Sequence, residues 1–584
     1  MSHPPIGIDL GTSTSLLCAF LEGKPFPVPS LLAEHRAPVV PSVVGYSKER
    51  DEIVVGYRAE NYRSRQDSFI QEVKRKMGTD ELVRLGTRSY RPQEVSAMLL
   101  KNMVHGASAH LGVDIAEAVI SVPANFKDAA RQATLDAALI AGLRVPMLIA
   151  EPTSAALAFG IQHLDADERV IVFDFGGGTL DISLLQMCEG VIEVERIDGD
   201  AQLGGKDFDS AIIDHVRREF SRSNPGCAPN ATMESHLRKE CERAKIRLST
   251  DDEAHISVPA YAMRAGEPIA LDLMLRRHEM ERAVAAVLAR ASDCLSRLLN
   301  GGDSLKRIDR ASVSRILMVG GTTYMPAVRQ RAAELMGREV SVDVDPDLAV
   351  GMGACVRAAI HSGLAGAAQD IVLADVSPFS IGVEVVAQLQ DEMFVPGIFS
   401  PLLERNQPIP HRSSHVYRLM HPEQAEVEIS VYQGNSAFVA ENELLARAKL
   451  EKIPPSTTGT PRELNIHFSY DSSGIADLEA LLPNTSCRAT LSVDPRQGRM
   501  TEEERAQATS DLSRRFEDTP RYEGAKSLLE RADTLVERHG GENVPSIAAA
   551  ALRLKHVLFG GRDAEIDAAE DLLTDALLDE GNIH

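Results

Sequence analysis

The chain has 584 residues, of which 44% are hydrophobic, and its formal net charge is −23 at pH 7. This length exceeds what one hydrophobic core can organise, so several domains are expected. The negative charge argues against a nucleic-acid backbone or an anionic membrane as the main ligand, because both of those ligands reward clustered lysine and arginine.

Two glycine-rich segments are predicted to form similar strand–turn–strand hairpins. They read Asp9-Leu-Gly-Thr-Ser-Thr14 and Asp174-Phe-Gly-Gly-Gly-Thr179, and each lies between apolar runs. Glycine lets a turn bring its N–H groups close to an anion, and hydroxyl side chains add further donors. Two such hairpins that face each other would clamp the phosphates of a nucleotide. The expected phosphate-binding residues are Gly11, Thr12, Ser13, Thr14, Gly176, Gly177, Gly178 and Thr179.

The acids of these two segments predict a cation. Asp9 and Asp174 would repel phosphate unless a hard cation lies between them, so the pair implies Mg²⁺ held partly through water. A single Asp-x-Gly-Thr is also typical of an ordinary tight hairpin, for backbone reasons alone. The duplication favours the phosphate clamp, since the chain has neither Gly-x4-Gly-Lys-Ser/Thr nor Gly-x-Gly-x-x-Gly between a strand and a helix.

Two later segments are predicted to extend this site. A helix around 237–248 carries Glu242, Lys245, Ile246 and Ser249 on one stripe, although such a stripe alone is more often a solvated face. Further on, Gly320-Gly321 separates a β-rich segment from a helix over 327–336. A helix N-terminus after glycines suits an anion, or the sugar and α-phosphate of a nucleotide.

The sequence changes character near residue 365. Residues 369–375 place a short apolar run between acids, whereas an ordinary linker would be polar. The run therefore predicts a segment that docks in one state and is released in another, with a plain edge strand as the alternative. Beyond it, alternating apolar residues over 426–431 and 464–470 predict a small antiparallel β-sandwich.

The last part of the chain is predicted to be helical. Thr501-Glu-Glu-Glu504 is a capping-box signature that opens a helical tail. From 563 to 578 the pattern predicts an amphipathic helix with acids on its other face. Its expected apolar stripe consists of Ile566, Ala569, Leu572, Leu573 and Leu577.

Six segments in order resemble the DnaK-type 70-kDa heat-shock chaperone family, and the likeness covers nearly the whole chain. They occupy residues 8–12, 122–124, 151–153, 173–179, 203–209 and 319–321. Later segments at 398–406, 420–424 and 431–434 look most like the divergent HscC branch. The resemblance implies a multidomain fold: an α/β actin-like two-lobed ATPase domain over 1–366, an apolar interdomain linker over 367–376, an antiparallel β-sandwich that binds peptide over 377–494, and an α-helical lid over 495–584.

The resemblance also implies a function. It predicts a cytoplasmic, ATP-dependent chaperone that binds exposed apolar peptide segments and couples ATP binding and hydrolysis to their release and capture. The expected ligands are ATP or ADP, Mg²⁺ and K⁺. The expected partners are unfolded or extended client polypeptides, a dedicated J-domain co-chaperone and a nucleotide-exchange factor, with no nucleic acid and no membrane.

Site roles follow from the resemblance, residue by residue. The expected catalytic residues are Lys74, Glu151, Asp174 and Thr179, and the expected metal-site residues are Asp9, Asp174 and Asp181. Besides the two hairpins, nucleotide would contact Gly204, Gly205, Glu242, Lys245, Ile246, Ser249, Gly320, Gly321, Tyr324 and Asp347. Peptide would contact Val383, Val386, Tyr417, Met420, Val427 and Ile429, several of which would otherwise be sandwich core. Interdomain coupling would involve Pro123, Arg131, Asp370, Val372, Leu373 and Asp375.

The chain departs from the family pattern at several of these positions. Ile246 and Tyr324 stand where relatives often sandwich adenine between two arginines, and their apolar and aromatic faces still suit a purine. Lys206 replaces a common acid, with no explanation in the sequence. Met147 and Ala150 stand where relatives commonly have the arginine and asparagine that meet a J-domain.

Two other classes of protein would also need paired phosphate hairpins. A sugar or acetate-type kinase of the same superfold is disfavoured, because a long β-rich and helical segment follows residue 366 and a small-molecule kinase has no need of it. An actin-like filament protein would polymerise with ATP.

Overall fold

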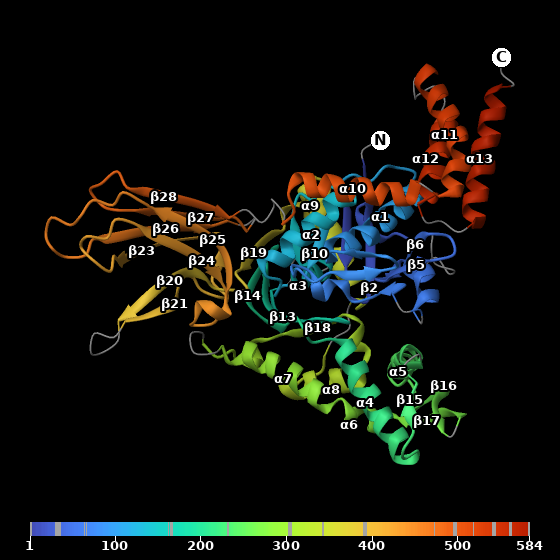
Figure 1. Ribbon diagram of the computed structural model, residues 1–584, viewed down its shortest axis with the longest axis horizontal. Coiled ribbons are helices and arrows are strands. Elements are labelled where there is room, and N and C mark those ends of the chain that lie inside the picture. Colours follow the sequence, from blue (N-terminus) through green and yellow to red (C-terminus); the bar gives the residue numbers. More distant parts are fainter. Residues whose placement is uncertain are drawn as a thin grey trace.

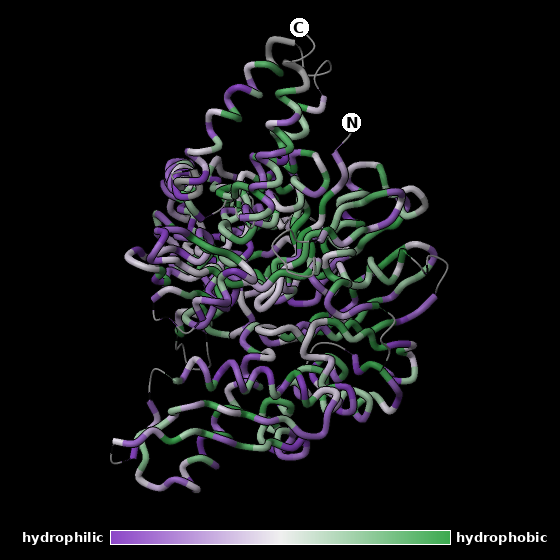
Figure 2. The backbone as a smooth tube through the Cα atoms, turned by 90° about the vertical axis from the view of Figure 1, so that its right-hand side faces the viewer, coloured by the Kyte–Doolittle hydropathy of each residue, from purple (hydrophilic) through white to green (hydrophobic). Residues whose placement is uncertain are grey.

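The structure is a computed structural model of the chain (Figure 1). It describes residues 3–29, 37–63, 65, 67–161, 163, 167–230, 233–264, 266–301, 306–340, 344–388, 394–471, 474–493, 499–517, 519–539, 545–559 and 563–581. Within these ranges no helix combines the length and apolarity that crossing a bilayer takes. Figure 2 shows hydrophobic segments running through the interior, with hydrophilic ones along the outer helices and loops.

The first lobe is built on a sheet in the order β11-β10-β1-β2-β3, with β4 paired to β2. Strand β1 runs parallel to β10 and antiparallel to β2, so the β1–β2 turn lies at the carboxyl ends of β1 and β10. The strands are β1 (Ile6–Leu10), β2 (Thr14–Leu21), β3 (Lys24–Pro27), β4 (Val39–Pro41), β5 (Val44–Ser47), β6 (Glu52–Val55), β7 (Phe69–Ile70), β8 (Val83–Leu85), β9 (Arg88–Tyr90), β10 (Val119–Val122) and β11 (Leu148–Ala150). The helices are α1 (Pro92–Leu111), α2 (Asp128–Ile140), α3 (Glu151–Gly160) and α9 (Ala349–His361).

The second lobe repeats this arrangement around a sheet in the order β18-β12-β13-β14-β19-β22. Strand β12 runs parallel to β18 and antiparallel to β13, as β1 does with β10 and β2. The strands are β12 (Glu168–Phe175), β13 (Leu180–Cys188), β14 (Val191–Asp200), β15 (Ala228–Pro229), β16 (Glu253–Arg264), β17 (Glu267–Arg276) and β18 (Arg315–Val319). The helices are α4 (Gly205–Ser223), α5 (Glu234–Arg247), α6 (Arg277–Ala283), α7 (Ala285–Asn300) and α8 (Pro326–Met336).

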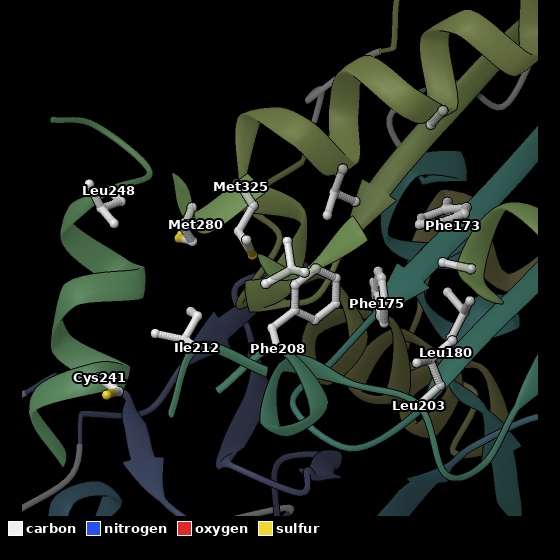
Figure 3. Close-up of a cluster of buried hydrophobic side chains, with 14 of the residues drawn as sticks. Phe173, Phe175, Leu180, Leu203, Phe208, Ile212, Cys241, Leu248, Met280 and Met325 are labelled. Atoms are coloured by element: carbon white, nitrogen blue, oxygen red, sulfur yellow. The ribbon is translucent and has the colours of Figure 1, made fainter. Parts of the chain in front are cut away.

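The core of the second lobe lies directly behind its glycine turn. Phe175, at the end of β12, packs against Phe208 of α4 with ring centroids 5.6 Å apart, and both side chains are buried (Figure 3). Burying aromatic side chains here fixes the end of the strand against the following helix. The turn after Phe175 is therefore held on a rigid base.

The segment after the second lobe is a strand that joins two domains. Strand β19 (Val372–Val376) pairs in parallel with β14 of the second lobe and antiparallel with β22 (Pro408–Ile409) of the next domain. The apolar run is thus part of a sheet in this structure, in a docked position. The boundaries at 366 and 376 stay predictions.

The β-sandwich has two four-stranded antiparallel sheets, in the orders β21-β20-β24-β25 and β23-β26-β27-β28. Buried residues from both sheets, such as Ile381, Leu403 and Ala480, form its core. The strands are β20 (Ile381–Gln388), β21 (Phe394–Leu403), β23 (His411–Arg418), β24 (Val427–Gln433), β25 (Glu443–Leu450), β26 (Glu463–Tyr470), β27 (Ala476–Leu481) and β28 (Arg488–Val493). The predicted boundary at 494 falls outside the described residues.

The described residues that follow form the helices α10 (Glu502–Glu517), α11 (Pro520–His539), α12 (Pro545–Val557) and α13 (Asp563–Gly581). The predicted capping box is present, because Thr501 N donates to Glu504 Oε2 at 2.9 Å and Glu504 N donates to Thr501 Oγ1 at 3.1 Å. The predicted stripe of α13 is correct except at Leu572, whose side chain is exposed. It lies one position from Leu573, which takes the core-facing place.

The helical segment lies on the first lobe and away from the β-sandwich (Figure 1). Met500, Ala508, Leu512 and Phe559 share a hydrophobic core with residues of α1 and α2. Arg505 of α10 also pairs with Asp136 of α2 at 3.1 Å, and Asp136 is fully buried. The expected lid is therefore docked on the first lobe in this structure.

Candidate nucleotide site and interdomain contacts

The two glycine hairpins face each other at very short range. A Cβ atom at Gly178 would lie 2.5 Å from Thr12 Oγ1, and one at Gly177 would lie 2.0 Å from Ser13 Oγ. Any side chain at these glycines would therefore collide with the opposite hairpin. Thr12 and Thr179 are buried, whereas Thr14 is exposed. The structure brings together the two segments that the sequence singled out.

Buried carboxylates gather beside the hairpins. Lys74 Nζ and Glu151 form a close ion pair, and both side chains are less than 10% exposed. Burial raises the pKa of Glu151 to about 7, although Lys74 opposes the shift. Burial also raises the pKa of Asp181 to about 6, and burial followed by the negative charge of Glu151 raises the pKa of Asp174 well above its usual value. So many acids would repel one another unless a further positive charge were present.

This charge pattern fits a cation held largely through water. Burial raises the pKa of Asp9 while Lys74 lowers it, so Asp9 belongs to the same electrostatic cluster. Across the ranges that the structure describes, no three His, Cys, Asp or Glu side chains form a group that could hold a metal ion. The acids are therefore electrostatic neighbours without a complete protein ligand set. Water and phosphate oxygens would have to supply the remaining ligands of Mg²⁺.

Three residues that the sequence analysis missed orient these groups. Ser121 Oγ donates to Asp9 Oδ1 at 2.8 Å. Asn125 donates to Asp181 Oδ1 from both its backbone N and its Nδ2, each at 3.1 Å. Arg75 contacts the second hairpin, because its Nε donates to Gly178 O at 3.0 Å. Ser121 and Asn125 flank the segment 122–124 that resembles the family, so their position in the sequence could have indicated a role at the site. Arg75 had no comparable signal.

The other two glycine pairs close around the second hairpin. A Cβ atom at Gly204 would lie 2.4 Å from Gly178 N, and one at Gly320 would lie 2.7 Å from Asp174 Oδ1. Thr322, which follows Gly321, donates from Oγ1 to Gly176 O at 2.8 Å. The segments 204–205 and 320–321 therefore lie against the second hairpin, and their contact with nucleotide stays a prediction.

Lys206 gains an explanation from its contacts. Its Nζ lies 2.9 Å from Glu242 Oε1 and 3.8 Å from Asp209, and its side chain is 10% exposed. Glu242 also pairs with Arg63 of the first lobe at 2.8 Å, while Lys245 pairs with Asp209 at 2.7 Å. Burial opposes the ionisation of Glu242, but Lys206 and Arg63 outweigh it and lower the pKa of Glu242 to about 2. Lys206 thus belongs to a charge network on the predicted nucleotide stripe.

Replacing Lys206 with methionine should lower the free energy of unfolding of the second lobe by about 1–3 kcal/mol, because two poorly solvated carboxylates would each lose a cationic neighbour. Urea unfolding of the full chain measures this. Arg243→Met is the matched control, since Arg243 pairs with Glu240 at 2.7 Å but is 62% exposed. The control should cost less than about 0.5 kcal/mol. Equal losses in both variants would contradict the role given to Lys206.

The predicted base-binding positions are open to solvent. Ile246 is 63% exposed and Tyr324 is 39% exposed. The guanidinium of Arg329 lies over the Tyr324 ring at 5.7 Å, and Tyr324 OH donates to Asp345 at 3.4 Å. Asp347, two residues on, contributes to the raised pKa of Tyr324 after burial. Ser249 Oγ donates to Lys245 O at 3.3 Å, on the last turn of the same stripe.

Two of the predicted coupling residues, Arg131 and Asp375, lie close together where the domains join. Burial raises the pKa of Asp375, while Arg131 of α2 lowers it, so these two side chains are electrostatic neighbours. Val372 N donates to Gly190 O at 3.0 Å, but its side chain is 56% exposed, whereas Leu373 is partly buried in the core around α3 and α9. Pro123 is buried and Asp370 is exposed at the end of a 3₁₀ turn.

Further contacts between the two domains were not predicted. Asp128 N, at the start of α2, donates to Gln433 Oε1 at 2.9 Å. Ile197 N of β14 donates to Asn406 Oδ1 at 2.9 Å, and Arg405 Nη2 donates to Ile197 O at the same distance. Local sequence patterns hold no signal for such pairs, because their partners lie in different domains.

The predicted peptide-binding residues divide by burial. Val383 and Ile429 are buried in the core of the sandwich, which was the alternative interpretation. Val386 is 40% exposed and Met420 is 37% exposed. Tyr417 and Val427 are half-buried, and Tyr417 OH shares a hydrogen bond with Ser400 Oγ at 2.9 Å. The structure does not bring all six residues to one exposed surface, and their role stays a prediction.

Known proteins are similar in sequence to this chain over almost its full length. The family model described as Hsp70 protein matches residues 81–542. Proteins named "Chaperone protein DnaK" from Thermotoga maritima and Thermotoga petrophila are each 36% identical over 570 residues, which cover 96% of this chain and 92% of theirs. The one from Cenarchaeum symbiosum is 34% identical over 534 residues, which cover 91% of this chain and 79% of its own. Placement in the HscC branch stays a prediction. The chain belongs to the Hsp70 family of ATP-dependent chaperones.

Proposed function

We propose that the facing hairpins hold the phosphates of ATP and that the buried charges beside them carry out hydrolysis. Thr12 and Ser13 would contact the β- and γ-phosphates from one side, with Gly176 to Thr179 closing from the other. Mg²⁺, when bound, would supply charge neutralisation on the phosphates, and K⁺ is the monovalent cation that we expect to accompany it. The observation that carries the proposal is the close approach of Gly178 to Thr12, which places the two glycine turns directly against each other.

In this proposal the protein positions water for in-line attack on the γ-phosphate and does not form a covalent intermediate. Lys74 would stabilise the charge that develops on the phosphate, and Glu151, paired with it, would orient the attacking water. Asp181, which accepts a hydrogen bond from Asn125, would help to hold the attacking water in place. Ser121 would keep Asp9 turned toward the cation.

We further propose that hydrolysis controls the β-sandwich through β19. Strand β19 pairs with β14, and β14 pairs with β13, which begins directly after the second hairpin. A nucleotide that favours the docked arrangement would therefore change the sandwich and speed the release of an extended client peptide. The domain boundaries proposed are 1–366, 367–376, 377–494 and 495–584.

The test of this function compares the release of a fluorescent apolar peptide with ATP and with ADP. ATP should accelerate release, and the chain should hydrolyse it. A protein that phosphorylates small metabolites and ignores peptide would be the kinase alternative, and ATP-dependent light scattering would indicate the filament alternative. Either result would contradict the proposal.

The J-domain partner is predicted to be a dedicated one. Met147 is partly buried and its sulfur accepts a hydrogen bond from Arg357 Nε at 3.1 Å, so this position offers no cation to an acidic partner. Losing a charge pair and, at Ala150, a hydrogen bond costs about 2–5 kcal/mol of binding. A general J-domain protein should therefore stimulate the ATPase weakly.

Steady-state ATPase with such a J-protein tests this, comparing the native chain with Met147→Arg plus Ala150→Asn. A gain confined to the double variant would support the prediction. Each chain without the J-protein serves as its own control. Strong stimulation of the native chain would overturn it.

A further inference from the structure

Two histidines from different domains meet at the surface where the terminal helices dock. His105 of α1 and His556 of α12 place their Nδ1 atoms 2.8 Å apart. His556 is 5% exposed, and its Nε2 lies 3.0 Å from Asp114 Oδ1, in the loop after α1. One ring must donate and the other must accept at this distance.

The surroundings of the pair are apolar and positively charged. His105 stacks on Phe559 with ring centroids 4.0 Å apart and an interplanar angle of 4°. Lys101 Nζ lies 5.1 Å from the centroid of the Phe559 ring, and Tyr522 of α11 meets the same ring edge-on. Lys555 of α12 adds a second positive charge nearby. Asp114 is the acid that faces the pair.

This geometry limits the pair to one extra proton. Across this distance only one of the two Nδ1 atoms can carry a proton, and the other must accept it. With both rings protonated, two N–H groups would point at each other across 2.8 Å. The docked arrangement cannot hold that state, whereas the undocked helices can.

We propose that the His105–His556 pair is a pH-sensitive latch that holds the terminal helices on the first lobe near neutral pH and releases them as the pH falls. The contact couples domains that are far apart in the chain, so its protonation acts on their docking and leaves each domain folded. Around the pair, Asn102 Nδ2 donates to Phe559 O at 3.2 Å and Lys101 Nζ donates to Ser513 Oγ at 2.8 Å. These contacts persist until the helices leave.

The sign of the effect follows from the pKa values. Burial, then His556 and the two lysines, lowers the pKa of His105 to about 3 from an ordinary 6.5. Burial also lowers the pKa of His556, with Asp114 opposing it. The undocked state therefore binds protons more readily, so docking is complete above about pH 6.5 and weakens below it. From pH 7.5 to 5.5 the docking constant should fall about tenfold for His105 alone, and up to about a hundredfold if both rings titrate.

The consequence for peptide rests on the proposed function. If docking accompanies fast release, then acidification would slow the release that ATP accelerates. Bound client would then stay captured at low pH even while ATP remains bound.

The experiment measures undocking in the full-length chain with ATP present, through the rate at which a thiol reagent labels Ala109→Cys. Ala109 of α1 is buried among residues of α11, α12 and α13, so its thiol becomes accessible when these helices leave. Peptide mass analysis separates this site from the native cysteines. Comparing variants at one pH cancels the titration of the thiol itself, and retention of intact ATP is checked separately.

At each pH the labelling rate of the parent chain is divided by that of His105→Gln. This ratio should be about tenfold higher at pH 5.5 than at pH 7.5. His556→Gln is the second variant and should flatten the response in the same way. His255→Gln is the matched control, because His255 lies on β16 and pairs with exposed Asp272. It should respond like the parent chain.

Several outcomes would overturn the latch. One is labelling of the parent chain that keeps the same ratio to His105→Gln at both pH values. Another is a His556→Gln chain whose labelling, relative to His105→Gln, rises at low pH as the parent's does, or a His255→Gln chain in which that rise is lost. If neither glutamine variant docks at pH 7.5, the pair is a packing requirement and the latch is also overturned. Loss of bound ATP would instead count against the proposed nucleotide site.

Discussion

Lys74→Ala should lower single-turnover ATP hydrolysis about a hundredfold while changing ATP affinity by less than roughly tenfold. Lys74 is a buried cation among Asp9, Glu151 and Asp174, and these charges determine its raised pKa against the effect of burial. Its removal would leave developing negative charge without a partner, whereas the hairpin contacts to phosphate would remain. Thr179→Ala should act similarly, because Thr179 lies buried in the second hairpin.

Lys76→Ala is the matched control for this prediction. Lys76 lies two residues away and pairs with Glu81, but its side chain is 36% exposed. Rapid-quench measurements of bound ATP should give the native rate for this variant. Native hydrolysis in both Lys74→Ala and Thr179→Ala would remove these two residues from the catalytic set.

Local patterns predicted the elements that make up the site. The segment around Gly177 and Gly178 is predictable because only glycine fits where two turns approach so closely. The capping box at Thr501 and Glu504 is likewise a purely local signal. Such features depend on residues a few positions apart, so one sequence is enough to find them.

Contacts across the lobes and domains were beyond the same reasoning. Lys206 looked unexplained because its partner Glu242 lies on another helix. Arg75, next to the predicted catalytic Lys74, had no predicted role, yet it donates to Gly178 O. The apolar stripe of a helix shows that a face is buried but not what buries it. Docking of the terminal helices on α1 through Phe559 and His556 therefore had no sequence signal.

The double substitution Val372→Asp plus Leu373→Asp should yield a chain that binds peptide but releases it at the same rate with or without ATP. A hundredfold shift between docked and undocked states corresponds to about 2.7 kcal/mol of differential binding. Placing a carboxylate in the partly buried position of Leu373, beside Ile192 in the register of β14, costs about that much in desolvation. Stopped-flow release of a labelled peptide measures the effect.

The structure makes this prediction more specific, because the two residues are unequally buried. Val372 is 56% exposed, so Val372→Asp alone should keep most of the ATP response, while Leu373→Asp alone should lose most of it. Met263→Asp plus Met274→Asp is the control, since both methionines are about half exposed on β16 and β17 and should tolerate charge. ATP that still accelerates release in the Val372/Leu373 variant would show that coupling does not pass through β19. In that case other contacts between the described parts of the two domains would have to carry the coupling, such as those of Asp128 with Gln433 and of Ile197 with Asn406.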